Sequence, residues 1–183
     1  MIPEAGSFFG SAPIILMIFL TYIYLTRKTK IMFNWYLACH QPGKETLYKA
    51  QLELSRLHID SFCPLIRLSR PRPDRPSGRL IIEPLFSGYI FIQFDPEITH
   101  TTKLTALSSV SHFVKFGCDI RPIPKTVIES LMKLPLCPTE QDVIAGRFKE
   151  KIVAITRVSN KHERTVMFLA LMEALNTPLR KSA

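Results

Sequence analysis

The sequence lacks the residue spacings that metal sites and enzyme active sites need. No CxxC pair occurs, and the few cysteines indicate a reduced, cytoplasmic protein rather than a disulfide framework: Cys39, Cys63, Cys118 and Cys137. A zinc site needs about four ligands at recognisable spacing, and no such set is present. The chain also has no carboxylate pair, Ser–His–acid set or phosphate-binding glycine loop. These absences argue against an enzyme, a metal and a bound cofactor.

Acidic residues are scarce relative to basic ones. Lys and Arg together number 24 against 15 Asp and Glu, which gives a net charge of +9. Such an excess predicts attraction to nucleic acid, to anionic lipid or to an acidic protein surface, and charge alone does not choose among them. With 183 residues, 46 % of them hydrophobic, the chain is expected to form one ordinary domain or two small ones.

Charged residues are also absent from positions 6–26, which contain the apolar run "PIILMIFLTYIYL". A transmembrane helix needs about 20 apolar residues, and the basic residues follow this run, whereas in a signal peptide they precede it. Residues 1–31 are therefore either a membrane anchor with its basic side in the cytoplasm, or they lie upstream of a true start at Met32. The short run, and the domain pattern that begins just after Met32, favour the second alternative and a cytoplasmic protein.

Residues 32–133 alternate between strand and helix patterns. Aromatic and β-branched runs predict strands at 35–40, 62–68, 80–95 and 113–116, the third with a bend at its Pro–Leu–Phe–Ser–Gly segment. Helices are expected at 45–57, 99–105 and 123–135, the first and last with apolar residues three and four positions apart. This order predicts an α+β domain with a mainly antiparallel sheet.

The run from Tyr89 to Phe94 is apolar on both faces if it is extended. Successive side chains of a strand point to opposite faces, so Tyr89 and Phe91 share one face while Ile90, Ile92 and Phe94 share the other. One face can pack on helices of the same domain. The other face then needs a second domain or a partner to cover it.

The segment 69–79 holds three prolines, four arginines and no apolar residue. It cannot bury a face, so it is a loop or a hairpin tip. It is either a solvated basic loop or an arm that faces phosphates. In the second case the candidate nucleic-acid-binding residues are Arg70, Arg72, Arg75 and Arg79, joined by Lys44 and Lys49 near the first helix.

The segment 141–183, after a proline-containing stretch at 134–140, has two alternative local structures. "KIVAITRV" at 151–158 has the β-branched alternation of a strand, whereas "ERTVMFLALMEAL" at 163–175 holds strong helix formers and neither Gly nor Pro. So short a segment does not easily hold a core alone. It must either lie on the first domain as a helical hairpin or close into a small barrel.

Several of these segments together resemble the NusG family of transcription elongation factors, and within it the specialised RfaH-like branch. The resemblance rests on "WYLACH", "EPLFSGYIFIQFD", "HTTK" and "VSHFVKFG", in that order, and on "AGRFKEKIVAI" and "ERTVMFLAL" in the tail. It implies an NGN domain at 32–133, a linker at 134–140 and a C-terminal domain at 141–183, in a monomer. That last domain would rest as a helical hairpin and convert to a KOW-type β-barrel that recruits the ribosome.

The resemblance also implies roles for particular side chains. An aromatic patch that docks on the β′ clamp helices of RNA polymerase matches Tyr89, Phe91 and Phe116. A segment that contacts the β gate loop matches His100, Thr101, Thr102 and Lys103. A salt bridge between the domains matches Glu83 and Arg164, and the apolar tail residues that cover the patch would be Phe148, Ile152, Phe168, Leu171 and Met172. Without the resemblance, the aromatics would be core residues, the HTTK segment a helix cap and the two charges surface residues.

The chain departs from the branch where non-template DNA is read. Glu53 stands in place of a histidine that contacts DNA, and Leu107 and Ser108 replace a Thr–Arg pair, although Lys49 matches a basic position. The loading sequence is therefore expected to differ, or recruitment to be weakly specific. The implied function is a transcription antitermination factor for particular operons. A general NusG-like elongation factor and a basic adaptor tethered to the membrane through residues 6–26 are the alternatives.

Overall fold

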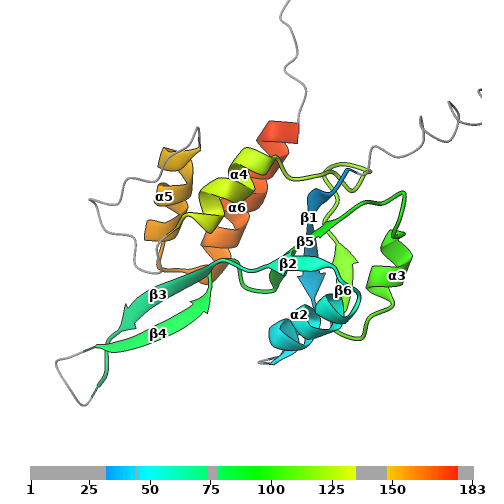
Figure 1. Cartoon of the computed structure of the whole chain (residues 1–183). Helices are drawn as coiled ribbons and strands as arrows, with labels where there is room; N and C mark the ends of the chain where they lie inside the picture. Colours follow the sequence, from blue (N-terminus) through cyan, green and yellow to red (C-terminus); the bar gives the residue numbers. More distant parts are fainter. Residues whose placement is uncertain (1–31, 44, 74–77, 135–147, 177–183) are drawn as a thin grey trace, which may run out of the picture. The chain divides into compact units, whose positions relative to one another are not determined.

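The computed structural model describes residues 32–43, 45–73, 78–134 and 148–176. The chain divides into two units, Met1–Met32 and Phe33–Ala183, and all the helices and strands below belong to the second unit (Figure 1). Within the described ranges, no helix is long and apolar enough to cross a membrane. The apolar run at 6–26 lies outside these ranges, as do residues 135–147, which include nearly all of the predicted linker.

A four-stranded sheet in the order β2-β5-β1-β6 forms the centre of the second unit. Its strands are β1 (Asn34–His40), β2 (Asp60–Phe62), β5 (Tyr89–Phe94) and β6 (Val110–Phe113). Each neighbouring pair is antiparallel. The predicted α+β fold with an antiparallel sheet is therefore confirmed.

One face of this sheet packs on two helices, α2 (Thr46–Arg56) and α3 (Thr101–Thr105). Helix α2 buries residues at the predicted three- and four-residue spacing, namely Leu47, Ala50 and Leu54. They form one apolar cluster with the β5 side chains of the same face, Ile90, Ile92 and Phe94. This cluster confirms that alternate β5 residues serve opposite faces, as the period of a strand requires.

The strands β3 (Leu65–Arg70) and β4 (Arg79–Pro84) form a separate antiparallel ribbon. Two predictions are corrected here. The segment 62–68 is not one strand, because Cys63 and Pro64 separate β2 from β3, and proline has no N–H for the ladder. The segment 80–95 forms strands of two different sheets, and Gly88 at φ 90° lies at the turn that separates them. The arginine-rich segment extends from the end of β3 to the start of β4, and its positions 74–77 lie outside the described ranges.

The strand predicted at 113–116 is displaced toward the N-terminus. The structure places β6 at Val110–Phe113, where its pairing with β1 shifts register beside His40. Phe116 instead forms an isolated bridge with Asp119, and the chain turns at Gly117 with φ 74°. This left-handed conformation, which glycine adopts without strain, lets the chain turn directly after Phe116.

Three helices lie together beside the other face of the sheet: α4 (Lys125–Met132), α5 (Lys149–Arg157) and α6 (Lys161–Asn176) (Figure 1). Helix α4 is the predicted third helix, with Pro124 at its N-cap. Helices α5 and α6 form a helical pair. Of the two alternatives predicted for the C-terminal segment, a helical hairpin and a small barrel, the described residues adopt the first. This helical pair shares one apolar cluster with β5 and α4.

Candidate functional site

The aromatic patch of Tyr89, Phe91 and Phe116 shares one apolar cluster with the helical pair. Phe91 is 1 % exposed, Phe116 is 7 % exposed, and Tyr89 is partly buried against the same apolar cluster. The Phe91 ring meets the Phe168 ring of α6 edge to face, with centroids 5.8 Å apart. The structure therefore brings the three predicted aromatics together on the face that the C-terminal helices occupy.

The apolar side of the helical pair includes the five residues expected there, together with Ile155, Leu169 and Leu175. Phe148, Ile152, Phe168, Leu171 and Met172 all belong to the cluster or pack against it. Phe168 also stacks on Phe86, with ring centroids 4.2 Å apart and an interplanar angle of 24°. Phe86 was not singled out from the sequence. Its only signal is its place in the "EPLFSG" segment, just before the turn at Gly88.

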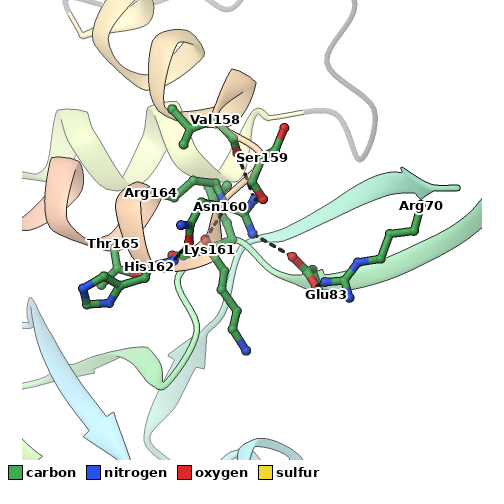
Figure 2. A network of polar contacts seen from close by, with 10 residues as sticks. Arg70, Glu83, Val158, Ser159, Asn160, Lys161, His162, Arg164 and Thr165 are labelled. Atoms are coloured by element: carbon green, nitrogen blue, oxygen red, sulfur yellow. Dashed lines mark hydrogen bonds and ion pairs between the residues drawn. The ribbon is translucent and has the colours of Figure 1, made fainter.

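Arg164 of α6 is completely buried and makes four hydrogen bonds (Figure 2). Its Nη2 donates to Oε1 of Glu83 at 2.8 Å, and its Nε donates to the carbonyl of Leu85 at 3.1 Å. Its Nη1 donates to the carbonyls of Val158 at 3.0 Å and Ser159 at 3.1 Å. A guanidinium does not lose its proton in proteins, so burying it requires such partners. Arg164 thereby joins β4 to the connection between α5 and α6.

Glu83 has a second cationic partner that the sequence did not reveal. Nη2 of Arg70 donates to Oε2 of Glu83 at 3.0 Å, so each carboxylate oxygen serves a different arginine (Figure 2). The Arg70 side chain is 58 % exposed and that of Glu83 is 17 % exposed. In the ribbon register Arg70 lies opposite Arg79, not opposite Glu83. Only the folded ribbon shows that the Arg70 side chain reaches Glu83.

The HTTK segment forms the start of α3. The His100 side chain caps this helix by accepting a hydrogen bond from the Thr102 backbone N–H at 3.3 Å, and its Nδ1 lies 2.8 Å from the Thr102 hydroxyl. The interpretation as a polar cap is therefore correct for His100. The side chains of His100, Thr102 and Lys103 are exposed, and Thr101 is half-buried. The segment therefore caps α3 and also exposes three of its four side chains.

Glu53 is held by two serines rather than left free on the surface of α2. It accepts hydrogen bonds from the Ser108 hydroxyl at 2.9 Å, the Ser109 hydroxyl at 2.5 Å and the Ser109 N–H at 3.3 Å. Lys49 lies 3.8 Å away and its side chain is 55 % exposed. The hydrogen bond from Ser109 is the main cause that lowers the pKa of the Glu53 carboxyl. Glu53 thus fastens α2 to the chain just before β6.

The other basic candidates lie on the ribbon or outside the described residues. Arg70 is the last residue of β3, Arg79 is the first residue of β4, and Arg72 follows β3. All three are exposed. Lys44 and Arg75 fall outside the described ranges. The basic residues of α2 and of the ribbon therefore belong to two separate elements.

Burial makes two of the described thiols, Cys39 and Cys63, harder to deprotonate. Burial raises the pKa of Cys63 to about 12, and burial also raises the pKa of Cys39. Cys118 is exposed, and Cys137 lies outside the described ranges. The described residues thus combine an apolar cover, ion pairs and exposed cations, an arrangement that suits binding rather than bond-making chemistry.

A comparison with protein families agrees with this fold. Residues 33–132, which extend from β1 to the end of α4, match the NusG family, described as transcription termination factor nusG. Members of this family are transcription factors without enzymatic activity, and membership implies binding to RNA polymerase. The match covers more than half of the 183 residues. The chain therefore belongs to the NusG family of transcription elongation and termination factors.

Proposed function

We propose that this chain is a specialised antitermination factor of the RfaH-like type, which suppresses pausing and termination in particular operons. The observation that supports this proposal is the helical pair, which packs on Phe91 through Phe168 and shares one apolar cluster with Tyr89 and Phe116. A general elongation factor gains nothing from a covered polymerase-binding patch, because it acts wherever it meets polymerase. A covered patch suits a factor that binds RNA polymerase only at certain sites on the template.

The cover lowers the affinity for polymerase through the populations of two states. Polymerase and the helical pair compete for the aromatic patch, so only the open molecules bind. The apparent affinity for polymerase is the affinity of the open state multiplied by the open fraction. An open fraction of about one in a thousand therefore weakens the binding free energy by roughly 4 kcal/mol. The Glu83–Arg164 ion pair and the Phe86–Phe168 stack are the contacts that hold the closed state.

In the open state the patch docks on the β′ clamp helices, while the exposed HTTK segment contacts the β gate loop. Bridging these two parts holds the clamp of polymerase closed and disfavours pausing. Lys49 and the ribbon arginines contact non-template DNA through its phosphates, which position a protein without reading sequence. The factor acts by binding alone, as a monomer in the cytoplasm.

The released C-terminal segment is proposed to refold as a KOW-type barrel that recruits the ribosome. Helix α6 is apolar beyond the side that faces the cluster, since Val166 is 51 % exposed and Met167 is 40 % exposed. A helix needs only one apolar side to cover the patch, whereas a barrel strand uses alternate residues for its interior. The same residues can thus serve two packings that differ by a few kcal/mol.

Transcription by purified polymerase with and without the full chain tests the proposal. We expect the wild-type protein to shorten pauses only on templates with a loading element, and a Glu83→Ala variant to act on many templates. Equal action of the wild-type protein on all templates would favour a general NusG-like factor. No effect of either protein on any paused template would refute the proposal, and membrane fractionation of the native protein separates a tethered adaptor from a cytoplasmic factor.

A further inference from the structure

Glu83 joins a buried arginine of the helical pair to an exposed arginine of the ribbon. We propose that Arg70 belongs to a nucleic-acid phosphate site on the ribbon, and that occupation of this site loosens the hold of Glu83 on Arg164. The inference rests on the proposed function in that it takes the helical pair to be a releasable cover. It adds a route by which phosphates bound at the ribbon act on the cover.

The end of the ribbon carries positive charge that strand pairing does not need. Arg70 and Arg79 lie directly opposite each other in the register, and Arg72 follows two residues later. Like charges that face each other across an antiparallel pair destabilise the pairing. An anion with several charges, such as a run of phosphates, would turn this repulsion into attraction. The arginine fork also fits two phosphate oxygens at once.

The two arginines bound to Glu83 differ in how easily their side chains can move away from its carboxylate. Arg70 is 58 % exposed, and an exposed ion pair of this kind contributes little to stability, so phosphate can displace the carboxylate at small cost. Arg164 is completely buried and cannot leave without moving α6. A phosphate that approaches the network therefore takes Arg70 first (Figure 2).

The loss of Arg70 acts on Arg164 through Glu83. Once phosphate holds Arg70, the Glu83 carboxylate has lost one of its two cations and has an anion as its new neighbour. Repulsion between these like charges favours movement of the carboxylate away from the network. Among the residues that the structure describes, Glu83 is the one carboxylate within ion-pair distance of Arg164, whose other partners are carbonyls. Its movement leaves a buried cation poorly compensated, which favours release of α6.

The coupling must also operate in the opposite direction, because linkage between two binding equilibria is reciprocal. In the closed state Glu83 withholds Arg70 from phosphate. A Glu83→Gln variant should therefore bind nucleic acid several-fold more tightly than the wild-type protein. An acidic protein surface could contact the same arginines, so the test includes poly-glutamate as a second probe.

The experiment uses the full chain, a short labelled DNA duplex of arbitrary sequence, and three variants. Binding is measured by fluorescence anisotropy over a range of salt concentrations, and the opening of α6 by hydrogen exchange of its amides. Arg70→Ala and the matched control Arg72→Ala each remove one exposed arginine. Both should weaken binding and lower the salt slope by about one. The duplex should speed α6 exchange in the wild-type protein and in Arg72→Ala, but not in Arg70→Ala.

Four results would overturn the inference: no duplex binding at low salt, no change of α6 exchange on binding, an equal change in Arg70→Ala, or an equal effect of poly-glutamate. None of these measurements contains polymerase. If the duplex opens α6 as expected but the protein never alters pausing, the proposed function fails and the coupling stands. If pausing is suppressed while the duplex leaves α6 exchange unchanged in every protein, the coupling alone fails.

Discussion

Oε1 of Glu83, next to the last residue of β4, lies 2.8 Å from Nη2 of Arg164, a completely buried side chain of α6. The two residues are 81 positions apart in the sequence. Their contact closes the helical pair over the aromatic patch at the edge nearest the ribbon. It is the polar counterpart of the Phe86–Phe168 stack, which holds the same helix through its apolar side.

Replacing Glu83 with Ala should release α6 from the rest of the fold. Breaking a buried ion pair by removing one partner costs about 3–5 kcal/mol, and we expect the lower end because Glu83 is 17 % exposed. Hydrogen exchange of the α6 amides should accelerate by at least a hundred-fold, as about 3 kcal/mol implies, while that of β1 and β5 stays slow.

The control for this variant is Glu129→Ala on α4. Glu129 forms an exposed pair with Lys125 at 3.7 Å, four positions apart on the helix. Such pairs contribute about 0.3–0.5 kcal/mol, so α6 exchange should not change. Unchanged α6 exchange in Glu83→Ala as well would show that the ion pair does not hold the cover.

Replacing Phe168 with Ala should separate the helical pair from the aromatic patch. The change removes the stack on Phe86 and the edge contact with Phe91, and it leaves a cavity in the cluster. Such substitutions cost about 3–5 kcal/mol. Polymerase affinity, measured by co-migration with the purified enzyme, should rise because the patch is exposed.

The matched control variant is Val166→Ala, which lies on the exposed side of the same helix and should leave polymerase affinity unchanged. An affinity that does not rise in Phe168→Ala would mean that the patch is not the docking surface.

Glu53→Gln should destabilise the region from β1 to α4 in a pH-dependent way. The pKa of Glu53 is lowered in the folded protein, chiefly by the hydrogen bond from Ser109. A lowered pKa adds stability that is present above the unfolded value of about 4.3 and is lost as the pH falls through the folded pKa. Urea denaturation should therefore find the variant less stable at neutral pH, with the difference vanishing in more acidic solution.

The Ser109→Ala variant tests whether the hydrogen bond from Ser109 causes this pH dependence of stability. Because Ser109 supplies the largest contribution to the lowered pKa, its removal should reproduce much of the same pH dependence. The double variant should lose less than the sum of the two single losses, since both remove one interaction. Additive losses would show that Glu53 is stabilised by something other than this hydrogen bond.

Replacing Lys103 with Ala should separate activity from stability in the HTTK segment. Lys103 is exposed on α3, so the free energy of unfolding should change by no more than about 0.5 kcal/mol. The suppression of pausing should fall, because the proposed contact with the gate loop loses a cation. His100→Ala, in contrast, removes the helix cap and should cost roughly 1 kcal/mol. Normal pausing activity in Lys103→Ala would remove this side chain from the proposed contact.

Local patterns in the sequence predicted much of the region from β1 to α4. The spacing of Leu47, Ala50 and Leu54 predicted the buried side of α2, and the alternation along β5 predicted two buried faces. Element boundaries were less accurate. The pattern could not show that Cys63 and Pro64 divide two sheets, or that pairing with β1 moves β6 to Val110, because both depend on distant strands.

The sequence by itself determined which side chains can lie inside and how many faces of β5 need a cover, because hydrophobicity and backbone period are local properties. It left the C-terminal segment between helix and strand, since its residues suit both periods. Tertiary structure decided for the helical pair, because α5 and α6 bury their apolar side against Phe91 and Phe86. It also decided that Glu83 serves both Arg70 and Arg164, since a carboxylate between two arginines arises only where three distant segments meet.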